Sequence, residues 1–142
     1  MAIVRPEAFA QSPSADFDGV FDWDFLRPAF AGTKIMPMDF DCVVERGGKF
    51  LCFETKNKGV EVPNGQRRAL ENAVMTGPWT VIILRGKCAS DINGWEVWCR
   101  GRHSGRFEQC PMTGNADDLV GFVRRWFLNA SKTTTARPEV TK

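Results

Sequence analysis

The sequence has little of what marks a zinc-binding, disulfide-bonded or membrane-spanning protein. Its five cysteines are an odd number with no Cys-x-x-Cys pair, and it has a single histidine. This pattern predicts neither a zinc site nor a disulfide framework. No apolar run reaches membrane-spanning length, and the N-terminus lacks the basic and apolar regions of a signal peptide. We therefore expect a protein of the reducing cytoplasm with no membrane partner.

An excess of charge of one sign is also lacking. The net charge of +2 permits binding to nucleic acid but does not demand it. A length of 142 residues and a hydrophobic content of 43% are typical of one globular domain. We expect this domain to cover residues 1–130, with a loose lead-in over residues 1–16 and a disordered tail over residues 131–142.

The most informative stretch runs from residue 37 to residue 56. Apolar and β-branched residues on both sides of Gly47 and Gly48 predict two antiparallel strands joined by a tight turn. With these glycines as the loop, counting outward along the ladder gives two charged pairs: Asp41 opposite Glu54, and Asp39 opposite Lys56. The alternation of strand side chains places all four on one face of the hairpin.

Asp41 and Glu54 would then be like charges directly opposed, which destabilises a hairpin. A hard divalent cation such as Mg²⁺ removes this conflict, because it binds carboxylate oxygens. Lys56 on the same face could hold an attacking water or offset charge on a phosphorus centre. The alternative is that Asp39 and Lys56 form an ion pair on a solvated face, where the other two carboxylates tolerate each other.

The rest of the chain predicts a mixed sheet flanked by helices. Residues 16–31 are compatible with a short helix that ends before Pro28. A helix is expected over residues 66–76, a buried strand over 79–84 and a second hairpin over 94–110. Asn115 is expected to cap a last helix, whose broad apolar surface fits either core packing or a homodimer interface. We expect core packing.

Several polar residues outside the hairpin are candidates for binding. Gln66 lies four residues before Leu70, so it should open the first long helix on the face that meets the sheet. It would bond either the site near Lys56 or the loop backbone. The basic residues that we expect to contact nucleic acid are Lys58, Arg67, Arg68, Arg102 and Arg106. Arg67 could instead pair with Glu71, and Trp98 could stack on a base or cover the core.

The order of Asp41, then Glu54-Thr55-Lys56 thirteen positions later, then Gln66 opening a helix resembles the PD-(D/E)XK nuclease superfamily. The spacing is similar to that of Holliday-junction-resolving members and of small phage-encoded relatives. The resemblance covers about residues 37–85. It implies an α/β fold in which a central mixed sheet carries the site, here with an additional C-terminal hairpin and helix.

The resemblance also implies roles for single residues. Asp41 and Glu54 would bind Mg²⁺ or Mn²⁺, with the Thr55 carbonyl as a further ligand and Asp39 as a ligand of a second ion or a group that orients the first. Lys56 would be the catalytic lysine, and Gln66 would lie beside the site. An acid from the first helical segment, Asp22 or Asp24, could approach the metal or simply face solvent.

These roles predict a metal-dependent nuclease acting on DNA, in phage or bacterial DNA processing. The first alternative is a nuclease-like module without catalytic activity that binds nucleic acid or a partner protein. A second alternative is a structural or interaction protein that uses the hairpin only as a scaffold. That alternative predicts no affinity for divalent cations.

Overall fold

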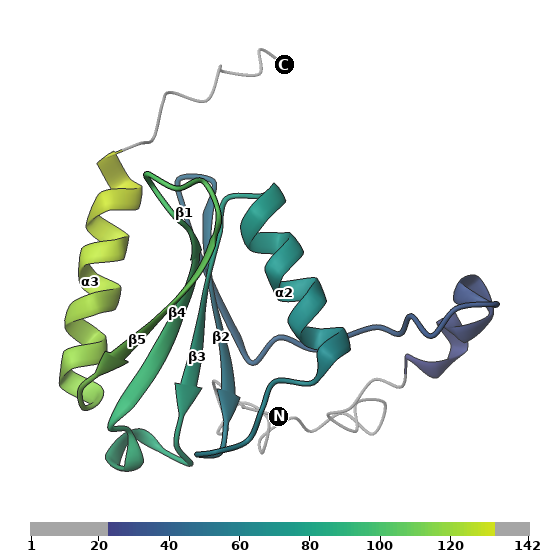
Figure 1. Cartoon of the computed structure of the whole chain (residues 1–142), viewed down its shortest axis with the longest axis horizontal. Helices are drawn as coiled ribbons and strands as arrows, with labels where there is room; N and C mark the ends of the chain where they lie inside the picture. Colours follow the sequence, from purple (N-terminus) through teal and green to yellow (C-terminus); the bar gives the residue numbers. More distant parts are fainter. Residues whose placement is uncertain (1–22, 133–142) are drawn as a thin grey trace, which may run out of the picture.

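The computed structural model describes residues 23–132, so the lead-in expected over residues 1–16 lies outside it. In chain order the elements are η1 (Asp24–Phe30), β1 (Cys42–Arg46), β2 (Lys49–Lys56), α2 (Asn64–Thr76), β3 (Trp79–Arg85), η2 (Ala89–Asp91), β4 (Gly94–Arg100), β5 (Phe107–Thr113) and α3 (Ala116–Lys132). The strands form one mixed sheet in the order β1-β2-β3-β4-β5. Helices α2 and α3 cover its opposite faces (Figure 1). The predicted α/β class, with a central mixed sheet flanked by helices, is confirmed.

The first hairpin follows the predicted register. Its opposed pairs are Cys42 with Phe53, Val43 with Cys52, Val44 with Leu51, Glu45 with Phe50, and Arg46 with Lys49. Gly47 and Gly48 have φ angles of 60° and 80°, which is the left-handed backbone that a tight hairpin turn requires and that glycine adopts without strain. The ladder ends at Cys42, so the two charged pairs predicted beyond that residue are not part of the sheet.

Helix α2 connects two parallel strands. β2 and β3 pair in parallel, and such a pair needs a crossover, which α2 supplies. Leu70 and Val74 are buried on the side of α2 that meets the sheet, as the helical spacing predicts. The helix begins at Asn64, two residues before the predicted start, and ends at Thr76 before Gly77, as predicted.

The second hairpin and the last helix complete the fold. β5 continues to Thr113, beyond the predicted end of the hairpin at residue 110. The Asn115 side chain accepts a hydrogen bond from the Asp118 N–H at 3.1 Å, and Asp118 accepts one from the Asn115 N–H at 2.9 Å. This reciprocal cap confirms the predicted helix start. α3 runs through Lys132, so the tail predicted from residue 131 is wrong for its first two residues, and its remainder lies outside the described part.

The core has one cluster on each face of the sheet. On the α2 face the buried residues are Cys52, Val62, Leu70, Val74, Val81, Ile83 and Trp98. On the α3 face they are Leu51, Ile82, Trp95, Val97 and Leu119. The side chains of Phe122, Val123 and Trp126 pack against this second cluster, which confirms core packing as a role of the last helix. Trp98 is fully buried, so it packs in the core and is not available to stack on a base.

The segment before β1 differs from the prediction. A helix was expected to end before Pro28, but Pro28 lies inside the 3-10 helix η1. The Ala31 N–H donates to the Pro28 carbonyl, and the Leu26 N–H donates to the Trp23 carbonyl. Neither of these hydrogen bonds needs an N–H from Pro28, so the 3-10 helix tolerates the proline. Within residues 23–132, no helix combines the length and the apolarity needed to cross a membrane.

Candidate functional site

A cleft of about 1090 Å³ lies where β2 ends, between the first turns of α2 and the extended segment before β1. Its lining residues are Lys34, Ile35, Met36, Met38, Asp39, Phe40, Asp41, Glu54, Pro63, Gly65, Gln66, Arg68, Ala69 and Asn72. The cleft therefore brings together five predicted site residues, namely Asp39, Asp41, Glu54, Gln66 and Arg68. Glu54 and Gln66 meet here because a loop of residues 57–63 joins the end of β2 directly to the start of α2, and the segment before β1 forms the other wall.

Asp41 lies just before β1 and is anchored to the neighbouring strand. Its Oδ2 accepts two hydrogen bonds from Thr55, one from the backbone N–H and one from the hydroxyl, both at 2.7 Å. Burial opposes ionisation of this carboxyl, but the bonds from Thr55 and the charge of Lys56 lower its pKa below the ordinary 3.8. The prediction that Asp41 faces Glu54 across the ladder is wrong, because Thr55 offers two donors where Glu54 would offer a like charge.

Glu54 is the buried carboxylate of the site. The residue is 5% exposed, and it lies on the α2 face of β2, two residues after the fully buried Cys52. Its Oε1 accepts a hydrogen bond from the Lys56 ammonium at 2.8 Å. Its Oε2 is buried and has no hydrogen-bond partner among residues 23–132. Leaving such an atom unsatisfied costs about 1–3 kcal/mol, and more for a charged group.

Lys56 and Asp39 are not joined as predicted. The Lys56 side chain is 19% exposed and pairs with Glu54 on its own strand. Asp39 is exposed and lines the cleft from the segment before β1. The cross-strand pair is wrong because the ladder stops at Cys42. Lys56 is also absent from the residues that line the cleft, and its ammonium contacts Glu54, which does line it.

Gln66 and Arg68 enter the cleft from the first turns of α2. Gln66 is half-buried and Arg68 is exposed, and both line the cleft. Ala69 and Asn72 extend the same wall. The sequence analysis did not identify Asn72, although its spacing of four from Arg68 places the two on one helix face. This polar stripe runs beside the apolar stripe that packs on the sheet.

The other predicted nucleic-acid contacts lie elsewhere. Arg67 pairs with Glu71 at 2.8 Å, donates to Gln109 at 2.8 Å and lies 4.9 Å above the Trp98 ring. Lys58 pairs with Asp91 at 3.0 Å. The remaining two, Arg102 and Arg106, are exposed at the tip of the second hairpin.

The tip of the second hairpin is far from the cleft along the sheet. Glu54 is in register with Ile83, which is opposite Glu96 on β4. The tip begins four residues further along, at Arg100, and each strand residue advances about 3.3 Å. Arg102 and Arg106 therefore lie toward the end of the sheet opposite the cleft.

Arg85 is a positioning residue that the sequence analysis missed. It is in register with Lys56 on the neighbouring strand. Its guanidinium pairs with Glu96 at 2.9 Å and donates to the carbonyl oxygens of Asn57 and Val60. These contacts fix the loop that follows β2, and with it the end of the strand that carries Glu54. The sequence signal that could have identified Arg85 is its position directly after the apolar run of residues 79–84.

Among the described residues of the first helical segment, 23–31, none supplies an acid to the cleft. Asp24 is exposed and pairs with Arg27, whose Nε lies 3.0 Å from Asp24 Oδ1. It borders a smaller hollow beside Trp23 and Phe30. Asp22 lies outside the described residues. A solvated position, the simpler of the two expectations, therefore fits Asp24.

The donor set fits a hard divalent cation. Asp41 and Glu54 present carboxylate oxygens to one cleft, and Mg²⁺ in proteins is bound by one or two carboxylates together with water. The buried Oε2 of Glu54 is the atom that a cation would satisfy. The role of the Thr55 carbonyl stays a prediction.

Comparison of the chain with family models, curated proteins and solved structures finds no match.

Proposed function

We propose that the protein is a metal-dependent nuclease of the PD-(D/E)XK type that hydrolyses phosphodiester bonds in DNA. The observation that carries the proposal is the buried Oε2 of Glu54, which has no hydrogen-bond partner in the described chain and belongs to a residue that lines a cleft together with Asp41. A fold selected only for stability would satisfy or replace this atom, because a buried, unpaired carboxylate oxygen is destabilising. Function explains why it is kept.

Each residue has a proposed task. Glu54 and Asp41 would hold Mg²⁺ or Mn²⁺, and Asp39 would bind a second ion or orient the first. When bound, a divalent ion supplies Lewis-acid polarisation of a phosphoryl oxygen and of water. Lys56 holds Glu54 in place and offsets negative charge near the cleft. Gln66 can donate a hydrogen bond from its amide into the cleft.

Arg68 is the proposed phosphate contact. It is exposed on the wall of the cleft, whereas Arg67 is occupied by Glu71 and Gln109. Arginine binds phosphate with paired N–H donors. The five cysteines are all free, which suits the reducing cytoplasm that we propose as the protein's setting.

The test is cleavage of labelled linear duplex, single-stranded and four-way-junction DNA with Mg²⁺, with Mn²⁺ and with EDTA. Wild type is compared with Glu54→Ala and Lys56→Ala, and with Glu61→Ala as a control at an exposed acid outside the cleft. We expect cutting that needs the metal, is lost in the first two variants and is kept in the control. If no DNA is cut and binding is the same in all four proteins, the nuclease proposal fails in favour of a binding module.

A second comparison tests the proposed phosphate contact. Arg68→Glu should weaken DNA binding and reduce the slope of log affinity against log salt by about 1, as expected when one phosphate contact is lost. Arg102→Glu is the matched control, since it makes the same charge change at the far end of the sheet. Equal losses in both variants would contradict a DNA path through the cleft.

A further inference from the structure

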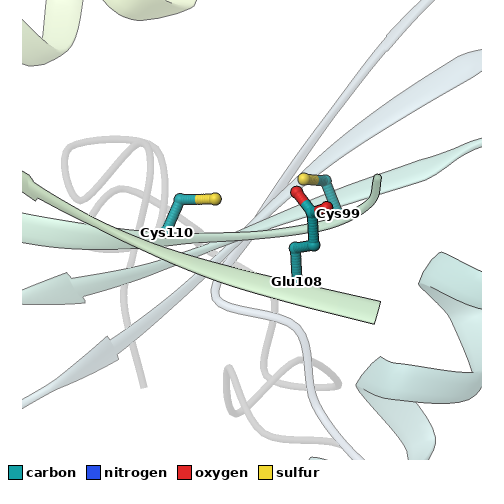
Figure 2. A group of neighbouring side chains, drawn as sticks. All are labelled: Cys99, Glu108 and Cys110. Carbon is teal, nitrogen blue, oxygen red and sulfur yellow. The ribbon is translucent and has the colours of Figure 1, made fainter. Parts of the chain in front are cut away.

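Two cysteines and a glutamate meet on the second hairpin, on the face that packs against α3. Sγ of Cys99, a carboxylate oxygen of Glu108 and Sγ of Cys110 all lie within 4.8 Å of one another. Figure 2 shows both sulfur atoms and the carboxylate turned toward one another across the two strands. The three residues come from β4 and β5, which pair along their full lengths.

The register explains why these three side chains converge. Cys99 is directly opposite Glu108, and Cys110 is opposite Val97, so Cys110 is the diagonal neighbour of Cys99. Diagonal Cα atoms in an antiparallel pair are about 7–8 Å apart, whereas a disulfide needs Cα atoms no more than about 6.8 Å apart. Two thiolates on one tetrahedral Zn²⁺, with Zn–S bonds of about 2.3 Å, are separated by roughly 3.8 Å. Small side-chain rotations reach that separation, so the pair suits a shared ion better than a disulfide.

The surroundings hold the carboxylate in this position. The Ser104 hydroxyl donates a hydrogen bond to Glu108 Oε1 at 2.9 Å. A Cβ atom at Gly101 would lie 2.1 Å from the same oxygen, so glycine leaves the space that the carboxylate occupies. On the other side, Cys99 and Cys110 pack against the apolar cluster of the α3 face, while both stay partly exposed. An ion can therefore enter from solvent and be bound beside the apolar cluster of the α3 face.

We propose that Cys99, Glu108 and Cys110 bind one Zn²⁺, with a water molecule completing four-coordination. Two sulfur ligands favour a thiophilic ion over Mg²⁺, and zinc accepts carboxylate beside thiolate. Binding replaces the proton of each thiol by a metal–sulfur bond and releases those protons to solvent. The site is on the opposite face of the sheet from Glu54, so it is independent of the proposed nuclease cleft, and its role is to clamp β4 to β5.

The test is titration of the reduced, metal-free protein with Zn²⁺ in competition with a chromophoric chelator, together with Co²⁺ absorption as a report of thiolate ligands. We expect one Zn²⁺ per chain and a thiolate-to-cobalt charge-transfer band. Both should be lost in Cys99→Ser and in Cys110→Ser. Cys88→Ser, at an exposed cysteine outside the hairpin, is the matched control and should bind like wild type. A large excess of Mg²⁺ should not displace the ion.

Three further variants keep both cysteines and test the carboxylate. Ser104→Ala removes the group that orients Glu108 and should weaken Zn²⁺ binding roughly 10-fold. Gly101→Ala should weaken it as much as Glu108→Gln does, because the added methyl displaces the Glu108 carboxylate. Unchanged thermal unfolding of the metal-free variants would show that they fold. Zn²⁺ binding that persists in Cys99→Ser and Cys110→Ser overturns the site.

Discussion

The Glu54–Lys56 pair makes a prediction that separates its role in function from its role in stability. Both side chains are largely buried, at 6% and 19% exposure, and one glutamate oxygen has no partner among the described residues. Removing one member of a buried pair leaves the other charge uncompensated, whereas replacing both with apolar residues is often neutral or stabilising. We therefore expect Lys56→Met to be less stable than wild type, and the double variant Glu54→Leu/Lys56→Met to be at least as stable.

The magnitudes follow from the burial. Lys56→Met should lose about 3 kcal/mol of the free energy of unfolding, at the low end of the range for a broken buried pair because water still reaches the lysine. For a chain of this length, 1 kcal/mol shifts Tm by about 3–4 °C, so the single variant should melt roughly 10 °C below wild type. The double variant should match wild type or exceed it by about 1–4 kcal/mol. Neither variant should cleave DNA.

The assay is thermal unfolding followed by circular dichroism, first in EDTA so that no metal contributes, and then with Mg²⁺. A ligand at 100 times its Kd adds about 2.7 kcal/mol to the stability of the state that it binds, so Mg²⁺ at that concentration should raise the Tm of wild type but not of the double variant. If the double variant melts as early as Lys56→Met, the loss of stability does not come from an uncompensated charge on Glu54. The argument from the unpaired oxygen would then be refuted.

Four other perturbations test the structure. Hydrogen bonds lower the pKa of Asp41 in the folded protein. The ionised Asp41 carboxylate therefore contributes its full stabilisation above the unfolded pKa of 3.8, and this contribution is lost as pH falls through the folded pKa. Asp41→Asn should remove that part of the acid unfolding transition measured by circular dichroism. Burial raises the pKa of Cys52 to about 12, while a bond with Ser90 lowers that of the exposed Cys88, so mass spectrometry after alkylation at pH 8 should show Cys88 modified first and Cys52 only on unfolding. In thermal melts, Gly48→Ala should cost about 1 kcal/mol because its φ is 80°, and Gly65→Ala in the first turn of α2 should stabilise by up to about 1 kcal/mol.

The fold was predictable where its determinants are local. The Gly47-Gly48 turn set the register of the first hairpin, because a two-residue loop makes Arg46 and Lys49 the first opposed pair and so fixes every pair beyond them. The apolar run that forms β3 and the Gly77-Pro78 stop after α2 are equally local signals. A helix between two buried strands then implies a parallel crossover.

The site was predictable only in part, because its details depend on competition between partners. Asp41 bonds Thr55 and is not paired with Glu54 in the ladder, which ends at Cys42. Arg67 is occupied by Glu71, Gln109 and the Trp98 ring, partners that only the packing of α2 on the second hairpin brings together. The wall contributed by residues 34–40 has no periodic pattern, so nothing in the sequence placed it beside α2.

The sequence analysis also missed the cluster of Cys99, Glu108 and Cys110, because strand pairing and not sequence spacing brings these residues together. Metal sites are usually sought from ligands spaced along the chain, and the absence of Cys-x-x-Cys pairs argued against zinc. A β-ladder uses a different rule, because residues on separate strands become neighbours when their numbers sum to nearly the same value. Cys99 and Glu108 are opposed in this way, and Cys110 is one diagonal step away. A spacing rule therefore misses donors that strand pairing assembles. In this chain the elements are fixed by local sequence, whereas the two candidate sites arise where distant segments are brought into register.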